Sequence, residues 1–188
     1  MLKISENHFV NGNKVKPPYP DNHCRLIVGM GCFWGAERMF WQQEGVYSTS
    51  VGYAAGKTID PTYREVCSGT TDHAEVVLIV YDTNLTNLDS LLPIFWEGHD
   101  PTQFMRQGND VGSQYRSIIF YDNDEMHQKI ESSRDQYQKE LSNAGYGNIV
   151  TEIRAAEEFF YAEDYHQQYL AKNPDGYCGL GGTGIKCS

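Results

Sequence analysis

Cys32 stands where an apolar run gives way to a helical pattern. The apolar residues 26–28 precede it, and Ala36, Met39 and Phe40 follow it at helical spacing. This pattern places the thiol in the first turn of a helix that follows a strand. Unpaired backbone N–H groups and the helix dipole favour an anion there, so we expect the pKa of the thiol to be lowered. The predicted chemistry is nucleophilic attack by a thiolate.

Two aromatic residues follow the cysteine directly. Phe33 and Trp34 would place an apolar wall beside the sulfur, which suits a small apolar substrate. The alternative is a buried Cys32 that packs as a small hydrophobic side chain. The local pattern alone does not decide between these two interpretations.

The C-terminal segment contains two more thiols. Cys178 and Cys187 are separated by eight residues, and five glycines lie between residues 176 and 184. Glycine gives a segment reach and several backbone states, which favours disulfide exchange, because one sulfur must approach another in line. A structural disulfide or two idle thiols are the alternatives. Zinc is not expected, because the chain has no CxxC or HxxxH pair.

A lone carboxyl, Glu75, begins the most apolar stretch of the chain. It stands between Ala74 and the apolar run 76–80. Desolvation there would raise its pKa and make it a general acid near neutral pH. The alternative is a glutamate that faces solvent at the edge of a sheet.

Polar side chains in two predicted loops could assist this acid. Tyr63 lies in the first loop, Asp110 lies in the second, and Tyr115 follows the second. Tyrosine hydroxyls are good donors to a polar oxygen. The alternative is that these tyrosines only pack, which is the commoner role for any one of the 13 tyrosines in the chain.

The remaining cysteines and histidines form no further pattern. Cys67 ends a loop and is expected to be buried, and Cys24 is assigned no role. His73, His99 and His166 share no ligand spacing. We therefore expect hydrogen-bonded structural histidines, no metal and no cofactor.

The composition narrows the class of protein. The chain of 188 residues has a formal net charge of −10, which disfavours nucleic acid and anionic membrane surfaces as partners. No run approaches the ~20 apolar residues of a membrane span. The N-terminus shows no apolar leader, and five cysteines in such a chain are more often redox-active than bridged. We predict a cytoplasmic monomer.

The strands and helices that position these side chains are mixed along the chain without a strict alternation. Strands are predicted at residues 25–30, 47–53, 73–81, 116–121 and 149–153. Helices are predicted from Cys32 to near Gly45 and at residues 88–96, 125–141 and 165–172. Long polar loops are predicted at residues 54–71 and 98–113.

This order of elements predicts a single α+β domain. We expect a mixed β-sheet with packed helices in a ferredoxin-like two-layer core. The catalytic domain would span residues 25–172. An extended N-terminal arm at residues 1–24 and a mobile glycine-rich redox tail at residues 173–188 would flank it.

Several stretches of the chain resemble the peptide methionine sulfoxide reductase A family. Residues 31–37, GCFWGAE, look like the signature of that family. The similarity extends from about Val28 to Cys187, and its further motifs are residues 61–69 (PTYREVCSG), 73–77 (HAEVV), 99–110 (HDPTQ through RQGND), 114–117 (QYRS) and 177–184 (YCGLGGTG). The family's motifs occur here in the family's order, so the resemblance covers nearly the whole chain.

The resemblance implies a role for each candidate residue in the first half of a reaction. Cys32 would attack the sulfur of methionine S-sulfoxide, in a protein, in a peptide or free. Phe33 and Trp34 would wall the pocket for the substrate methyl group. Glu75 would supply a proton to the sulfoxide oxygen, within a polar network whose other members are Tyr63, Tyr115 and Asp110.

The same resemblance implies how the enzyme would be restored. Cys178 would resolve the sulfenic acid formed on Cys32, and Cys187 would then exchange with Cys178. Thioredoxin is the expected final reductant. The implied cellular task is the repair of proteins oxidised under stress.

Two departures and two other functions remain to be considered. Phe104 stands where the family is expected to have glycine, and Asp72 stands where it is expected to have a small residue; both are expected near the rim of the pocket. A redox-regulated binding module would use the thiols as a switch without turnover. A cysteine hydrolase would need His73 or His99 as a base for Cys32.

Overall fold

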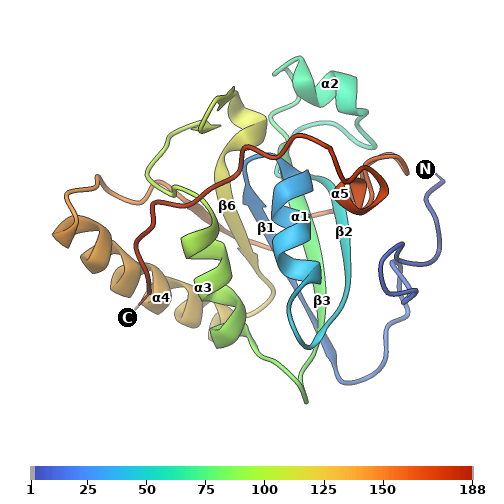
Figure 1. The fold of residues 1–188 in the computed structure, drawn as a ribbon, viewed down its shortest axis with the longest axis horizontal. Coiled ribbons are helices and arrows are strands. Elements are labelled where there is room, and N and C mark those ends of the chain that lie inside the picture. The colour runs from blue at the N-terminus through green and yellow to red at the C-terminus, as the bar shows by residue number, and fades with distance from the viewer. Residues whose placement is uncertain (1–2, 188) are drawn as a thin grey trace.

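A mixed six-stranded sheet forms the centre of the protein, with helices packed on one of its faces (Figure 1). The computed structural model describes residues 3–187, so the first two residues of the predicted arm and the last residue of the predicted tail lie outside the described residues. The strand order is β7-β6-β1-β3-β2-β8. Their bounds are His23–Met30 (β1), Val46–Ala54 (β2), Ala74–Asp82 (β3), Ser117–Tyr121 (β6), Glu152–Ala155 (β7) and Phe160–Tyr161 (β8).

The four central strands have the ferredoxin-like order. β1 pairs antiparallel with both β3 and β6, and β2 pairs antiparallel with β3. Helix α1, Phe33–Trp41, connects β1 to β2, and helix α3, Leu88–Gly98, lies between β3 and β6 in the chain. β7 extends the sheet parallel to β6. The predicted α+β two-layer core with a mixed sheet is confirmed.

Asparagine caps determine where two helices begin. Asn87 accepts a hydrogen bond from the Ser90 N–H in front of α3, and Asn123 does the same for Met126 in front of α4, Asp124–Asn143. Each such cap contributes ~1 kcal/mol of stability. α4 packs beside α3 in the same layer (Figure 1). Within residues 3–187, no helix is long and apolar enough to cross a membrane.

Strand β3 is buried on both faces, as its unbroken apolar run predicts. Val77 packs with Phe40 of α1 on the helical side. Val76 packs with Phe120 on the opposite face. Because side chains alternate along a strand, Glu75 points to the same side as Val77, toward the helices.

The elements near the first loop differ from the prediction. α1 ends at Trp41 rather than near Gly45, which lies at φ +83° in the turn before β2. The loop predicted at residues 54–71 contains a short helix α2, Tyr63–Cys67, started by a capping box between Thr62 and Glu65. A helix of five residues shows no apolar period, so only its cap could have been recognised.

Other short elements also differ. β7 and helix α5, Tyr169–Lys172, begin later than predicted, and β8 was not predicted. The loop predicted at residues 98–113 contains a small hairpin of β4, Arg106–Gln107, and β5, Asp110–Val111, and a 3₁₀ turn at Ser113–Tyr115 follows. Cys24, placed in the arm by the prediction, lies in β1. The division into arm, catalytic domain and tail stays a prediction.

Candidate active site

Cys32 lies at the junction between β1 and α1, where it is the N-cap residue of the helix. The preceding Gly31 has φ +96°, and a Cβ there would lie 2.6 Å from the Cβ of Gln107. Glycine therefore allows the chain to turn sharply from the strand into the helix. The predicted placement of the thiol at the start of a helix after a strand is confirmed.

Glu75 lies on β3 directly beside this junction. Its side chain is buried, and its Oε2 accepts a hydrogen bond of 3.1 Å from the Phe33 N–H. Burial raises the pKa of this carboxyl to about 8, with the Asp110 carboxylate acting in the same direction and the Phe33 N–H against both. The alternative of a solvent-facing glutamate is wrong, and the carboxyl can hold a proton at neutral pH.

A cavity of about 160 Å³ joins the candidate residues. Its walls come from the β1–α1 junction, α2, β3, β5, the 3₁₀ turn and the C-terminal segment, and its lining residues are Cys32, Phe33, Trp34, Tyr63, Glu75, Asp110, Tyr115 and Tyr177. Segments far apart in the sequence thus bring together every candidate predicted outside the tail. Tyr177 is the lining residue that the sequence analysis missed.

A larger cavity of about 440 Å³ lies elsewhere on the molecule. It is lined by Cys24 and Arg25 of β1 together with Asp122 and Lys129 near and on α4, and by none of the candidate catalytic residues. Size alone therefore does not locate the site. The convergence of a thiol and a buried carboxyl does.

The acidity of Cys32 differs from the expectation. Burial raises the pKa of the thiol to about 12, and the Glu75 and Asp110 carboxylates act in the same direction. The backbone N–H groups of Trp34 and Gly35 lower it, but by less. The predicted lowering is wrong for the free site, because desolvation exceeds the effect of the helix start. A protonated Glu75 would remove one of the opposing charges.

The Trp34 indole is held on two sides. Its N–H donates a hydrogen bond of 3.0 Å to His166 Nδ1. Its ring stacks on Tyr169, with centroids 3.9 Å apart and an angle of 14°. Phe33 also packs on His166, at 5.1 Å between ring centroids. From the sequence, His166 was expected to be a structural histidine and Tyr169 was not a candidate; the aromatic cluster at residues 165–169 was the available signal.

His73 and His99 are also hydrogen-bonded. The Nε2 of His73 lies 2.8 Å from the Thr58 carbonyl, and the Nε2 of His99 lies 2.6 Å from the Ser117 hydroxyl. This agrees with the expected structural roles. Within the described part of the chain, no group of three or more His, Cys, Asp or Glu side chains could hold a metal ion.

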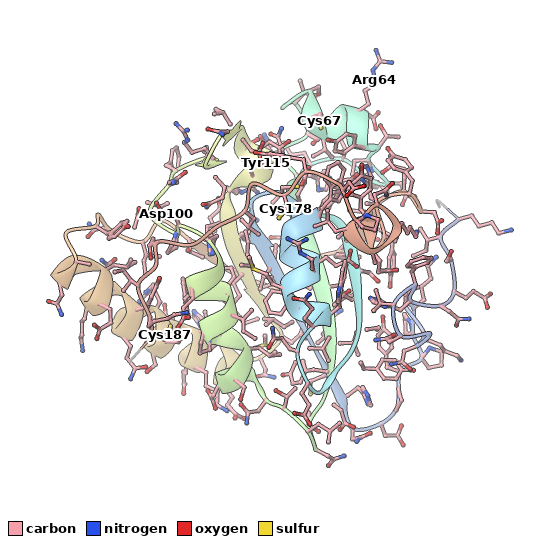
Figure 2. The ribbon with its side chains drawn as sticks, in the orientation of Figure 1. Arg64, Cys67, Asp100, Tyr115, Cys178 and Cys187 are labelled. Carbon is pink, nitrogen blue, oxygen red and sulfur yellow. The ribbon has the colours of Figure 1, made fainter. Side chains whose placement is uncertain are left out.

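The two tail cysteines lie in different places (Figure 2). A Cβ added to Gly35 would be 2.7 Å from Cys178 Sγ, so this sulfur rests on the first turn of α1. Cys187 lies away from it, on the side of α3 and α4, where its N–H donates a hydrogen bond of 2.8 Å to Glu97 Oε1. All five cysteines are free thiols. Cys178 thus lies on the helix that begins just after Cys32, although it does not line the cavity, and Cys187 lies elsewhere.

One expectation near the cavity needs correction, and two others stay predictions. Cys67 is exposed rather than buried, and its thiol is hydrogen-bonded with the Tyr63 hydroxyl. Phe104 is exposed, and Asp72 forms an ion pair with Lys57. Neither Phe104 nor Asp72 lines the cavity.

Comparison with known proteins gives a consistent result. A profile of the family "Peptide methionine sulfoxide reductase" matches residues 24–183. The curated peptide methionine sulfoxide reductase MsrA 2 of Nostoc sp. is 60% identical over 187 residues, covering 100% of this chain and 84% of that protein. The corresponding MsrA of Methylococcus capsulatus is 59% identical over 186 residues, covering 99% and 84%.

A solved structure shows the same fold. Methionine sulfoxide reductase A of Corynebacterium diphtheriae matches with a TM-score of 0.88 and 43% identity, over 99% of this chain and 90% of that one. The site combines a buried acid, a thiol at a helix start and an apolar wall, and the family match identifies it as the site of a thiol-dependent oxidoreductase. The chain belongs to the peptide methionine sulfoxide reductase A family.

Proposed function

We propose that this protein reduces the S epimer of methionine sulfoxide to methionine, with Cys32 as the nucleophile. The observation that carries the proposal is the convergence of Cys32 and the buried Glu75 in one cavity with Phe33 and Trp34. The aromatic side chains suit the substrate methyl group. The polar side of the cavity, where Glu75 lies, suits the sulfoxide oxygen. The family assignment supports both the reaction and its substrate class.

The first half-reaction converts a thiol and a sulfoxide into a sulfenic acid and a thioether. The Cys32 sulfur attacks the sulfoxide sulfur while Glu75 gives a proton to the oxygen, and the S–O bond of the substrate breaks. The released hydroxyl oxygen bonds to the Cys32 sulfur, and the transient S–S bond breaks, so that the thioether leaves with its electron pair. The substrate sulfur gains two electrons and the cysteine sulfur loses two. Tyr63 and Tyr115 line the same cavity and donate hydrogen bonds to the oxygen.

Asp110 has a different task in this scheme. Its carboxylate lies close enough to raise the pKa values of both Glu75 and Cys32. It therefore helps to keep the acid protonated before the substrate arrives. Its own contact with substrate is not required for this effect.

The second half-reaction regenerates the thiol. Cys178 condenses with the Cys32 sulfenic acid, forming a disulfide and releasing water. Cys187 then attacks Cys178 and forms a second disulfide, which an external dithiol reduces. Mxr1 from Saccharomyces cerevisiae, 23% identical to this chain, has been solved in complex with Trx2. We propose that a thioredoxin is also the reductant of this protein.

The function is tested by resolving the two epimers of a methionine sulfoxide compound by chromatography. With dithiothreitol present, the protein should consume the S epimer and leave the R epimer. Without reductant, thiol titration should show that enzyme thiols are lost in a fixed ratio to the methionine product that is formed. Consumption of neither epimer, or product formation without loss of enzyme thiols, would overturn the proposal.

A cytoplasmic location and a monomeric state accompany this proposal. The five unpaired cysteines support a reducing compartment. Fractionation of the source cells would test the location. Light scattering of the purified protein would test the monomer.

A further inference from the structure

We propose that Leu180 is a positioning residue for the resolving thiol, because it anchors the tail on the first turn of α1 and so holds Cys178 close to Cys32. The inference rests on the proposed function, since it concerns the sulfenic acid formed on Cys32. Leu180 does not line the cavity. It acts through the position of Cys178.

Two glycines at the junction of β1 and α1 form the seat for Leu180. A Cβ added to Gly35 would lie 3.0 Å from the Leu180 Cβ and 3.3 Å from its Cδ2. A Cβ added to Gly31 would lie 3.7 Å from the Leu180 Cδ1. The absence of side chains at both glycines lets the tail approach the helix closely. Leu180 is partly buried there and packs against the main core.

Cys178 shares this seat. Its Sγ would lie 2.7 Å from a Cβ added to Gly35. Gly35 follows Cys32 by three residues, and residues three apart at a helix surface are neighbours, with about 5–6 Å between their Cβ atoms. The Cβ atoms of a disulfide are about 3.8 Å apart. A local shift of Cys178 along the helix start is therefore enough to form the first disulfide.

The part of the tail beyond Leu180 is held separately. Ile185 packs against the main core, and the Cys187 N–H donates to Glu97. Between these contacts and Leu180, the tail has three exposed glycines, at positions 181, 182 and 184. Glycine permits several backbone states, so this stretch can act as a hinge. Cys187 can then travel to Cys178 while Leu180 stays on its seat.

The step that Leu180 assists needs no further reactant. The Cys178 sulfur attacks the sulfur of the Cys32 sulfenic acid, an S–S bond forms, and the S–O bond breaks. The hydroxyl group leaves with the Cys178 proton as water. An anchored thiol has a high effective concentration at its target. Loss of the anchor lowers that concentration and leaves the chemistry of both sulfurs unchanged.

The first test measures how the sulfenic acid is partitioned. Enzyme without external reductant reacts with the S epimer in the presence of dimedone, which adds to sulfenic acids, and peptide mapping compares the Cys32 adduct with the Cys32–Cys178 disulfide. Leu180→Ala should raise the ratio of adduct to disulfide by roughly threefold to thirtyfold. The rate of the first product formation should stay parental. Leu180→Met, which conserves the volume, should restore most of the loss.

Two controls isolate the anchor. The adduct rate in a Cys178→Ser background, with and without Leu180→Ala, corrects for any change in access of dimedone to Cys32. Ile185→Ala removes an aliphatic side chain that packs against the same core from beyond the hinge glycines, and it should leave the ratio unchanged. An equal rise in Ile185→Ala, or no corrected rise in Leu180→Ala, would overturn the proposal.

A substitution in the seat tests the same contact from the other side. Gly35→Ala places a methyl group where Leu180 and Cys178 now rest, so the tail must lift. It should raise the ratio of adduct to disulfide as Leu180→Ala does, and the two effects should be less than additive. This variant also carries the test if Leu180→Ala does not fold. Full additivity, or an unchanged ratio in Gly35→Ala, would contradict a shared seat.

Anchoring can also be measured without any turnover. In the fully reduced protein, iodoacetamide should alkylate Cys178 roughly twofold to tenfold faster in Leu180→Ala than in the parent, because the segment is released more often. Ile185→Ala should leave this rate unchanged. A parental alkylation rate in an active Leu180→Ala enzyme would overturn the role of Leu180 alone. A parent that reduces neither epimer would overturn the proposed function, and the alkylation rates would still report whether Leu180 anchors the tail.

Discussion

The cavity and the tail carry thiols in opposite kinds of surroundings. Around Cys32, the walls include β3 and the start of α1, and the acid Glu75 is buried and accepts a hydrogen bond from the backbone N–H of Phe33. The segment that carries Cys178 and Cys187 has no helix or strand among its described residues and is largely exposed. The first half-reaction needs fixed geometry, whereas the second needs one sulfur to travel. The two regions are built accordingly.

The tail is nevertheless held at both ends of its path. It crosses the start of α1 and continues to the side of α3 and α4 (Figure 1). Cys178 rests on Gly35, while Glu97 accepts the N–H of Cys187 and forms an ion pair with Lys186. For Cys187 to reach Cys178, this contact with Glu97 must open.

The largest effect is expected from the nucleophile. Cys32→Ser should abolish product formation even in a single turnover, because a serine hydroxyl is almost entirely protonated near neutral pH. Rapid quenching of enzyme in excess over substrate would measure this step. Cys24→Ser, at an exposed site on β1, is the matched control. Product from Cys32→Ser at the parental rate would place the nucleophile elsewhere.

The buried acid should rank second. Glu75→Gln should slow sulfenic acid formation by ~10²–10⁴-fold, since glutamine keeps the shape but cannot give up the proton. The exposed Glu44 supplies the control substitution Glu44→Gln, which should have no effect. A single-turnover rate equal to that of the parent would show that the proton comes from another group, with Tyr63 and Tyr115 next to be tested.

The pH dependence follows from the order of two pKa values. Burial raises that of Glu75 to about 8 and that of Cys32 to about 12. The reaction needs a protonated acid and a thiolate, so Glu75 and Cys32 together must hold one proton. This singly protonated state predominates only above the pKa of Glu75, the lower of the two values. The kcat/KM for the S epimer should therefore rise with pH up to about 8 and then level off.

Glu75→Gln should change the shape of this profile. Without the carboxyl, the titration near pH 8 is lost, and kcat/KM should keep rising across the accessible range as the thiol ionises. A parental profile that falls above pH 8 would contradict this scheme, because the reactive state would then hold both protons.

The sequence predicted the parts of the cavity that local patterns encode. The turn from β1 into α1 places Cys32 and Phe33, and the unbroken apolar run of β3 buries Glu75. Tyr63, Asp110 and Tyr115 come from or follow loops that show no period, so the pattern made them candidates only, and the resemblance to the family gave them their roles. The fold class followed from the order of elements.

Three features depended on tertiary contacts that no local pattern encodes. His166 and Tyr177 reach the site from segments far along the chain, and their neighbours in sequence lack a regular period. The pKa of Cys32 was predicted to be lowered but is raised, because a helix start is visible in the sequence and the depth of burial is not. Cys67 looked buried in a loop but lies exposed at the end of α2.

The tail thiols should affect turnover rather than the first step. Cys178→Ser should form one equivalent of product at the parental rate and then stall with thioredoxin as reductant. Dithiothreitol, which can reach the sulfenic acid directly, should restore some turnover. Cys187→Ser should stall as a disulfide between Cys32 and Cys178, visible by peptide mapping under non-reducing conditions. Parental turnover with thioredoxin in both variants would make the tail thiols bystanders.

The smallest effect is expected at the contact that holds the end of the tail. Burial raises the pKa of Cys187 to about 11, and the Glu97 carboxylate acts in the same direction. Glu97→Gln keeps an acceptor for the Cys187 N–H but removes the charge, so the Cys187 thiolate becomes more populated. Exchange with the disulfide of Cys178 should then quicken by less than about tenfold, the change that a full pKa unit would bring.

Stopped-flow measurement of the disulfide exchange after one turnover would measure the effect of Glu97→Gln. Sulfenic acid formation serves as the internal control, because Glu97 lies outside the cavity around Cys32 and should leave that step unchanged. Glu140→Gln is the matched variant, since that carboxylate raises the pKa of Cys187 by less. A slower exchange in Glu97→Gln would mean that the contact guides Cys187 toward Cys178 instead of holding it back, and the tail would then be a prearranged path rather than a restrained one.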